Sequence, residues 1–358
     1  MMRWPAATLQ ALGPLTVLAL AIAACGSATG DGGGAGGPAT GADEPGGEIR
    51  MARATWDTGF MQAAIYQQLL DELGYDVTDP AEETREPVTF YPALARGELD
   101  LWVNGWFPLH EPFLRGELVT GQQISEPIEP VGTQVPAGAI QGYLVDRETA
   151  EELDLTSMED FTRPEVIEAF DDGDGVVELL GCNDGWGCNL AIEDHIESLA
   201  WGESVEQVVG DYIELIAEAE QRIAAGEPTL FYTWTPNWTV DVLVPGEDVV
   251  WLESPALPDE DDPTSVEGLT GCAGSDPCDL GWVVNDIRAV ANADILEDNP
   301  PVRRLLEAVE IPLADIAAQN ARMNAAEEYT EDDIRADARD WIDANRDLVD
   351  EWLATARG

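Results

Sequence analysis

The sequence predicts an α/β fold with a mainly parallel sheet, and two observations favour this class. Short apolar runs of strand length alternate with longer segments in which apolar residues recur at helical spacing, the order typical of β-α-β units. The chain has 358 residues, of which 45% are hydrophobic, enough for two domains of ordinary size around a buried core. A disordered acidic chain is therefore excluded despite the high charge.

The first elements set the pattern. Ile49–Thr55 is a short apolar run, and Phe60–Leu73 has apolar residues at helical spacing up to Gly74, a residue that suits a helix end. Val88–Tyr91 predicts the next strand, and Leu99–Val103 predicts another after a short helix.

The alternation continues to the C-terminus. Further strands are expected at Gly142–Asp146, Gly175–Leu180, Leu230–Thr233 and near Trp282–Val284. Further helices are expected at Ser157–Phe170, after Cys188, at Ser204–Ala225 and from the last strand to the end of the chain.

Two segments are candidate crossovers between domains. They are Ala139–Tyr143 and Trp251–Ser254. They would divide the body into a discontinuous first domain, residues 48–141 and 254–358, and an inserted second domain, residues 142–253.

The charge of the chain is strongly acidic. Asp and Glu number 71 against 17 basic residues, all of them arginine, for a formal net charge of -54. Such a field repels phosphate backbones and anionic membrane surfaces, so no nucleic-acid partner is expected. Another interpretation of the acidity is adaptation to salt, because carboxylates keep a surface hydrated when charges are screened.

The N-terminus predicts an exported, lipid-anchored protein. An apolar stretch, Leu12–Ala24, has the length of a signal-peptide core and is too short to span a membrane as a helix. It leads into Cys25 through a run that resembles a bacterial lipobox, so residues 1–24 would be removed and Cys25 would carry the lipid. A secreted protein with a coincidental cysteine is the alternative.

The lipid anchor would be the only contact with the membrane. Residues 25–47 are Gly-rich and predict a flexible tether, and no later apolar run has the length of a membrane span. The folded body would therefore lie at the outer face of the cytoplasmic membrane.

The remaining four cysteines form two short loops of C-x5-C spacing. They are Cys182 with Cys188, and Cys272 with Cys278. Because this is not the C-x2-C spacing of zinc sites, two local disulfides in an oxidising compartment are expected. Four reduced, buried thiols are the alternative. Neither a metal site nor a cofactor is expected, since no His/Cys cluster or cofactor fingerprint has the required spacing.

Three tryptophan-bearing segments lie at predicted strand ends. They are NGWFPLHE (residues 104–111), GCNDGWGC (181–188) and YTWTPNW (232–238). Ligands of parallel α/β sheets bind beyond the carboxyl ends of the strands. One exposed tryptophan is common, but three such loops indicate a site.

The indoles of Trp106, Trp186 and Trp234 favour a methylated cation. Indole faces carry negative potential, and each cation–π contact contributes about 0.5–2 kcal/mol when desolvated. A quaternary ammonium loses little hydration between such rings, whereas a primary ammonium would lose strong hydrogen bonds.

The same loops offer donors for an acid group. The main-chain N–H groups of Gly187 and Cys188 lie at a predicted helix start, which attracts anions. His110, four residues after Trp106, would donate to the same carboxylate. Taken alone, His110 would more often be a structural histidine.

These segments resemble one known family. The sequence is similar to the glycine betaine/proline betaine-binding proteins of the ProX kind, in the wider betaine/choline/carnitine-binding family of ABC importers. AIQGYLVD, DVVWLESPALP and IPLADIAAQNARM also match it, in order, and the resemblance covers about Glu48 to Trp352.

The resemblance implies a class II periplasmic-binding-protein fold, with two α/β domains joined by a hinge and the ligand cleft between them. It implies that Trp106, Trp186 and Trp234 form an aromatic box around the cation. A further implication is a protein without enzymatic activity.

The resemblance also implies a carboxylate site and partners. The carboxylate would be held by His110 and by the main-chain N–H groups of Gly187 and Cys188, with Cys182 bonded to Cys188. The chain, expected to be a monomer, would deliver glycine betaine or proline betaine, as osmoprotectants, to an ABC permease and its ATPase.

Other functions remain open on the residues alone. The same scaffold would also suit choline, carnitine or a sulfonium analogue. A surface hydrolase of a methylammonium compound and a structural or adhesive lipoprotein are the alternatives from other classes.

Two features depart from the ProX pattern. The pair Cys272 and Cys278 is not part of it and is interpreted as a structural staple. Trp56 and Asp57 resemble a segment of choline-type and other betaine-type relatives, where Trp56 would add a fourth wall and Asp57 would meet a ligand hydroxyl. The alternative is a packing tryptophan followed by a helix N-cap aspartate.

Overall fold

The computed structural model describes residues 46–171, 173, 175–258 and 263–358. The predicted signal peptide, the predicted lipidation site Cys25 and all but the last two residues of the predicted tether lie outside these residues. Within the described part of the chain, no helix combines the length and the apolar character that a membrane span requires.

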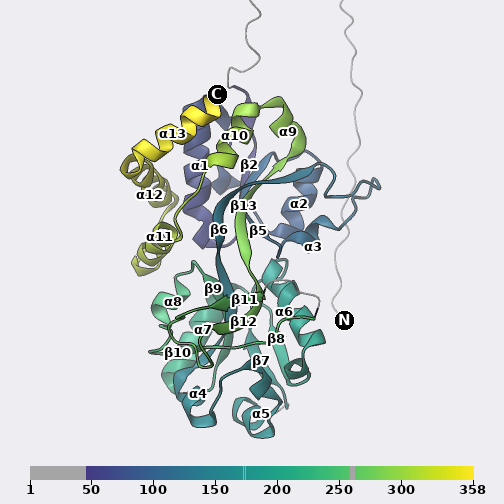
Figure 1. Cartoon of the computed structure of the whole chain (residues 1–358), viewed down its shortest axis with the longest axis vertical. Coiled ribbons are helices and arrows are strands. Elements are labelled where there is room, and N and C mark those ends of the chain that lie inside the picture. The colour runs from purple at the N-terminus through teal and green to yellow at the C-terminus, as the bar shows by residue number, and fades with distance from the viewer. Residues whose placement is uncertain (1–45, 172, 174, 259–262) are drawn as a thin grey trace, which may run out of the picture. The chain divides into compact units, whose positions relative to one another are not determined.

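Strands and helices alternate through most of the described chain (Figure 1). The strands are β1 (Glu48–Ile49), β2 (Met51–Ala54), β3 (Asp76–Val77), β4 (Thr84–Arg85), β5 (Leu101–Phe107), β6 (Ile128–Asp146), β7 (Val177–Leu180), β8 (Val205–Val208), β9 (Leu230–Thr235), β10 (Val249–Leu252), β11 (Pro263–Val266), β12 (Cys278–Val283) and β13 (Asn285–Asn292). The α-helices are α1 (Phe60–Leu73), α2 (Pro87–Ala95), α3 (Glu111–Leu114), α4 (Arg147–Leu153), α5 (Pro164–Phe170), α6 (Gly187–Ser198), α7 (Tyr212–Ala225), α8 (Thr239–Val242), α9 (Ala293–Asp298), α10 (Pro300–Ala308), α11 (Leu313–Ala325), α12 (Glu331–Ala344) and α13 (Arg346–Arg357). Short 3-10 helices are η1 (Asp57–Gly59), η2 (Pro80–Glu82), η3 (Met158–Thr162) and η4 (Ala200–Ser204).

The main sheet confirms the α/β class but is mixed rather than mainly parallel. Among the described residues its strand order is β4-β2-β5-β13-β6-β9-β7-β8, with β10 also paired to β6. Both ends are parallel, as predicted for β-α-β units. The centre is antiparallel because β13 returns between β5 and β6, and β9 then pairs with the far part of β6.

Strand β6 lies at the centre of this sheet and connects its two parts. Its residues up to Ala139 pair with β13, and those from Ile140 onward pair with β9 and β10. The chain crosses back at the β12–β13 junction. Trp282 of β12 still packs on Tyr143 in the later part of β6, with ring centroids 5.5 Å apart, whereas β13 pairs with β5 and the earlier part of β6. Below, residues 46–139 and 285–358 are called the first half, and residues 140–283 the second half.

Helix α1 illustrates why the first half folds as predicted. It spans the predicted residues and ends at Gly74, whose φ of 100° is the left-handed conformation that glycine adopts most easily. Its residues Ile65, Leu69 and Leu70 are fully buried. Helix α12 packs along it (Figure 1).

One predicted strand is wrong. Val88–Tyr91 lies in helix α2, which begins at Pro87, where a proline ring suits the first helical position. Phe90, Tyr91 and Leu94 are buried on one side of this helix. A short, mainly apolar run fits either a strand or a buried helix, so the sequence pattern did not decide between them.

Three further segments differ from the prediction. Ser204–Ala225 divides into β8 and α7, because the Asp211 side chain accepts hydrogen bonds from Ile213 and Glu214 and so caps a new helix. Ser157–Phe170 divides into η3 and α5 at a proline. Strand β13 was expected as helix; it follows β12 after a single residue, which leaves no room for the usual turn signal.

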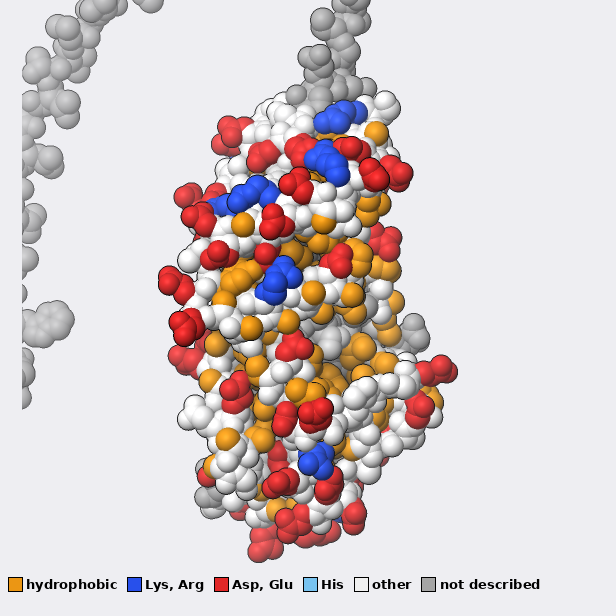
Figure 2. Space-filling model, turned by 90° about the vertical axis from the view of Figure 1, so that its left-hand side faces the viewer, with side chains coloured by type: hydrophobic (Ala, Val, Ile, Leu, Met, Phe, Trp, Pro, Cys, Tyr) orange, Lys and Arg blue, Asp and Glu red, His pale blue; other side chains and the backbone are white. Residues whose placement is uncertain are grey.

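The surface of the described residues is rich in carboxylates. Figure 2 shows one face, on which red Asp and Glu side chains outnumber blue arginines. The structure contains both disulfides, Cys182–Cys188 and Cys272–Cys278. The second disulfide joins the middle of the β11–β12 loop to the start of β12.

Candidate ligand-binding site

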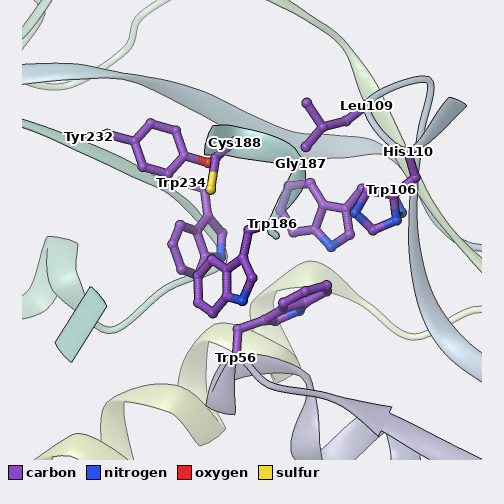
Figure 3. Close-up of a pocket in the computed structure, with 9 residues that line it drawn as sticks. All are labelled: Trp56, Trp106, Leu109, His110, Trp186, Gly187, Cys188, Tyr232 and Trp234. Atoms are coloured by element: carbon purple, nitrogen blue, oxygen red, sulfur yellow. Dashed lines mark hydrogen bonds between the residues drawn. The ribbon is translucent and has the colours of Figure 1, made fainter. Parts of the chain in front are cut away.

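Four tryptophans from separate segments line one cavity (Figure 3). Trp56 follows β2, Trp106 lies near the end of β5, Trp186 precedes α6, and Trp234 lies on β9. The cavity and its opening to solvent together contain about 310 Å³ of empty space. Its other lining residues are Leu109, His110, Gly187, Cys188 and Tyr232. The structure thus brings together every residue predicted to hold the ligand apart from Asp57.

The indole planes enclose the cavity from different sides. The ring of Trp186 lies 5.3 Å from that of Trp56 and 5.9 Å from that of Trp234, centroid to centroid, and both pairs are inclined by 75°. None of the four indoles is more than 7% exposed. Rings at such angles present several electron-rich faces to one small volume.

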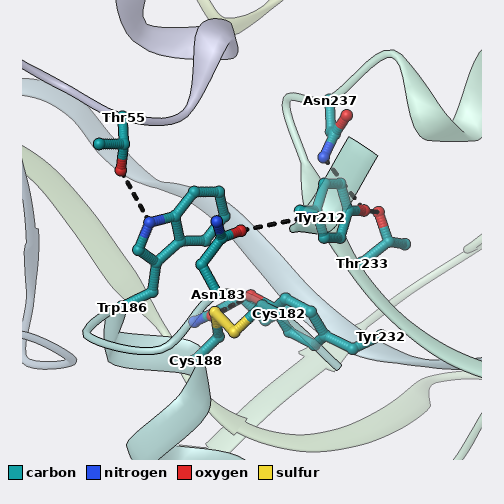
Figure 4. Close-up of a disulfide and its surroundings, with 10 residues drawn as sticks. Thr55, Cys182, Asn183, Trp186, Cys188, Tyr212, Tyr232, Thr233 and Asn237 are labelled. Atoms are coloured by element: carbon teal, nitrogen blue, oxygen red, sulfur yellow. Dashed lines mark hydrogen bonds between the residues drawn. A yellow bond between two sulfur atoms is a disulfide. The ribbon is translucent and has the colours of Figure 1, made fainter. Parts of the chain in front are cut away.

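Hydrogen bonds at the ring edges fix these orientations. The Asn104 amide oxygen accepts from Trp56 Nε1 at 2.7 Å and from Trp106 Nε1 at 2.9 Å. Two N–H donors require an oxygen acceptor, which determines the orientation of the amide. Trp186 Nε1 donates to Thr55 Oγ1 at 2.7 Å (Figure 4).

His110 is a neutral imidazole with one hydrogen available to the cavity. Burial lowers its pKa from 6.5 to about 3. Its Nδ1 accepts from the main-chain N–H of Trp106 at 3.2 Å and lies 3.0 Å from the Tyr91 hydroxyl. Because Nδ1 accepts, the imidazole hydrogen resides on Nε2, which is then a donor beside the cavity that the ring lines.

The start of helix α6 supplies further donors. The helix begins at Gly187, and its cap residue Trp186 makes no side-chain capping bond, so the first main-chain N–H groups keep their donor capacity. A Cβ atom on Gly187 would lie 2.8 Å from Leu109 Cγ and 3.1 Å from His110 Cδ2. Only glycine therefore allows the helix start to approach His110 this closely. The Cys182–Cys188 disulfide ties this loop to the first turn of the helix (Figure 4).

Residues 47–344 match the family described as the substrate binding domain of ABC-type glycine betaine transport systems. The chain belongs to this family. The resemblance found in the sequence is thereby confirmed, and with it the class of protein, a substrate-binding component of an ABC transporter rather than an enzyme.

Two relatives are similar over most of their length. The glycine betaine-binding periplasmic protein OusX of Dickeya dadantii is 35% identical over 312 residues, which cover 86% of this chain and 90% of that protein. The glycine betaine/proline betaine-binding periplasmic protein of Salmonella typhimurium is 32% identical over 320 residues, covering 88% and 92%.

Two solved structures share the fold. One is lactococcal OpuAC in its closed-liganded conformation with glycine betaine, with a TM-score of 0.61 at 17% identity over 86% of this chain and 99% of that chain. The other is an ABC-transporter choline binding protein in complex with choline, with a TM-score of 0.64 at 16% identity over 86% and 91%. The predicted periplasmic-binding-protein fold is confirmed by these neighbours.

Asp57 occupies a different place in this betaine-family domain. It does not line the cavity, and its two carboxylate oxygens each lie 3.3 Å from Trp238 Nε1, which donates to them. Burial raises the pKa of the Asp57 carboxyl, and the hydrogen bond from Trp238 opposes that shift. Trp56, the residue predicted with it, does line the cavity.

Sequence reasoning missed several residues of the site. Tyr232 had a usable signal, because residues two apart on a strand share a face and Trp234 was already predicted. Asn104 had the same signal, since it lies two residues before Trp106 on β5 and accepts from that indole. Thr55 had none, since its bond to Trp186 connects side chains whose proximity only the fold creates. Among the described residues, no group of three or more His, Cys, Asp or Glu side chains could hold a metal ion.

Proposed function

We propose that this chain captures glycine betaine or proline betaine in the tryptophan-lined cavity and delivers it to an ABC permease driven by a cytoplasmic ATPase. The observation that carries the proposal is the presence, in one cavity, of four indole walls beside a neutral histidine and a helix start. The walls suit a methylated ammonium head, and the donors suit an acid tail.

The indole walls favour a cation that makes no hydrogen bonds. A quaternary ammonium group between Trp56, Trp186 and Trp234 would contact several ring faces, each contributing about 0.5–2 kcal/mol. The Nε1 groups of Trp56 and Trp186 are already bonded to Asn104 and Thr55, so these rings offer the ligand faces rather than donors.

The polar side of the cavity favours a carboxylate. His110 stays neutral because of its low pKa, and it therefore keeps Nε2–H as a donor without a charge that would repel the ammonium head. The N–H groups of Gly187 and Cys188 add donors at the positive end of the α6 dipole. Hydrogen bonds to a charged acceptor are stronger than those to the hydroxyl of choline.

Closure of two domains belongs to the same proposal. The cavity walls come from both halves of the chain, so a ligand between them stabilises the closed arrangement. The hinge would lie where the chain crosses between the halves, within β6 at Ala139–Ile140 and at the β12–β13 junction, Val283–Asn285.

Lipid anchoring at Cys25 completes the proposal and has its own test. The relatives named above are periplasmic proteins, and the lipobox-like run would hold this one, as a monomer, at the outer face of the cytoplasmic membrane. Labelled palmitate should enter the unaltered chain and not the Cys25→Ala variant. A protein that takes up no labelled palmitate and stays in the aqueous phase of a detergent phase separation would refute the anchor.

Calorimetry of the purified protein against a cargo panel tests the function. The panel holds glycine betaine, proline betaine, carnitine, choline and the sulfonium analogue of glycine betaine. Glycine betaine or proline betaine should bind tightest, since each combines a methylated cation with a nearby carboxylate. Tighter binding of choline would move the assignment to the choline-type alternative, and absence of binding to any cation would refute the site.

A further inference from the structure

Three consecutive residues after strand β2 each contact a tryptophan of the second half. Thr55 Oγ1 accepts from Trp186 Nε1 at 2.7 Å, and the Trp56 ring lies 5.3 Å from the Trp186 ring. Both carboxylate oxygens of Asp57 lie 3.3 Å from Trp238 Nε1. Residues 55–57 are called the clasp below.

The two outer residues of the clasp act outside the cavity. Neither Thr55 nor Asp57 is among the lining residues, so their bonds require no ligand. Trp186 does line the cavity, and Trp238 does not. The clasp therefore connects one wall of the box, and one tryptophan beside the box, to the opposite half of the chain.

Burial makes these bonds specific to the closed arrangement. Trp186 and Trp238 are each 6% exposed, while Thr55 and Asp57 are half-buried, so in this arrangement an indole N–H that lost its acceptor would have little access to water. When the halves separate, water takes the place of Thr55 and Asp57 as acceptor. The two hydrogen bonds thus stabilise the closed form only after the two halves of the chain have come into contact.

The loop that carries Trp186 packs closely against the first half on both sides of that tryptophan. A Cβ atom on Gly185, whose φ is +82°, would lie 2.7 Å from Val88 Cγ1, and one on Gly187 would lie 2.8 Å from Leu109 Cγ. Both neighbours belong to the first half. Because this packing fixes the backbone of the loop, the hydrogen bond to the Thr55 hydroxyl determines the orientation of the Trp186 indole.

We propose that Thr55 and Asp57 are positioning residues that stabilise the closed form through Trp186 and Trp238, independently of the ligand. The inference rests on the proposed function. Loss of either bond should shift the equilibrium toward the open form and so speed ligand release. Because Asp57 does not touch the cavity, its loss should weaken all cargoes by the same factor.

Stopped-flow tryptophan fluorescence on the purified full chain tests the clasp through the rate of glycine betaine release. Thr55→Val and Asp57→Leu should each release ligand roughly tenfold faster, the effect of losing one partly buried hydrogen bond. Asp57→Asn keeps an acceptor oxygen and should restore most of the slow release. The matched controls are Thr89→Val and Asp343→Leu, two exposed positions of the first half.

Two further readouts separate a clasp from a general loss of structure. In Asp57→Leu the ratio of glycine betaine to choline affinity should stay within about twofold of the unaltered protein, because the walls are unchanged. In ¹H–¹⁵N spectra of the liganded protein, the indole signal of Trp238 should move in the Asp57 variants, and that of Trp186 in Thr55→Val.

The possible failures are distinguishable. If the unaltered protein binds no cation, the proposed function fails. If it binds, but Thr55→Val and Asp57→Leu release ligand at the rate of the controls, the clasp fails alone. If Asp57→Leu does not fold, two measurements decide the matter: release from Thr55→Val and the Trp238 indole signal in Asp57→Asn. Fast release and a shifted signal support the clasp, whereas control-like release with an unmoved signal overturns it.

Discussion

Gly187 lies so close to Leu109 that a Cβ atom at position 187 would stand 2.8 Å from Leu109 Cγ. The two residues belong to different halves of the chain, and both line the cavity. Closure of the proposed site therefore depends on the absence of a side chain at one position.

Gly187→Ala should weaken glycine betaine binding by roughly tenfold or more. The added methyl group must push the helix start away from Leu109, and overpacking of this kind costs about 1–3 kcal/mol in the closed state. Calorimetry measures the loss. Gly46→Ala, at a position with open space around it, is the matched control and should bind normally. Equal affinity in both variants would contradict the close approach.

Trp186→Ala should cost more than an order of magnitude in affinity, because it removes a cation–π wall and lets water into the cavity. The control is Trp341→Ala, a tryptophan on α12 that stacks on Trp352 at 6.0 Å and lies outside the cavity. Trp341→Ala should lower the melting temperature without changing affinity. Unchanged binding in Trp186→Ala would refute the box.

Asn104→Leu should weaken binding roughly tenfold at nearly constant side-chain volume. The variant leaves the N–H groups of Trp56 and Trp106 without their shared acceptor, so both rings lose their fixed orientation. Two indole signals should shift in the ¹H–¹⁵N spectrum. Asn324→Leu, at an exposed position, is the control, and an unshifted indole spectrum in Asn104→Leu would disprove the shared acceptor.

The buried His110 should make stability fall as the pH is lowered from about 6.5 toward 3. In the unfolded chain this histidine takes up a proton below its ordinary pKa of 6.5, whereas burial keeps it neutral in the folded chain down to about 3. The unfolded state thus binds more protons in this window, so the contribution of His110 to stability is complete above 6.5 and is lost below it.

Urea unfolding of the unaltered protein and of His110→Gln, at pH 7.5 and pH 5 and at constant ionic strength, isolates this contribution. The many carboxylates act equally in both proteins, so the difference between their pH slopes reports His110. The unaltered protein should lose more stability on acidification than His110→Gln does. Parallel slopes would show that His110 is not neutral in the fold.

Local patterns predicted much of the fold, and the failures have physical causes. Phe60–Leu73 was predictable because helical spacing and a terminal glycine agree. Val88–Tyr91 was misassigned because a short, mainly apolar run fits two structures, and β13 was missed because its partners β5 and β6 come from distant parts of the chain. A strand whose pairing is entirely long-range leaves little local signal.

The site was predictable where a residue type carries the chemistry. Trp106, Trp186 and Trp234 were found because indoles at strand ends are unusual, and all three line the cavity with Trp56. The contact of Asp57 with Trp238 was not foreseen, since it joins side chains that the sequence separates widely. Packing that crosses between the halves is created by tertiary structure alone.

The placement of β13 has a consequence for the order in which the protein matures. This strand fills the position between β5 and β6 although it is made last among the strands. A growing chain that already contains every tryptophan of the box still lacks the strand that joins β5 to β6 in the first half. The receptor can therefore become competent to bind only after synthesis has passed Asn292, the last residue of β13.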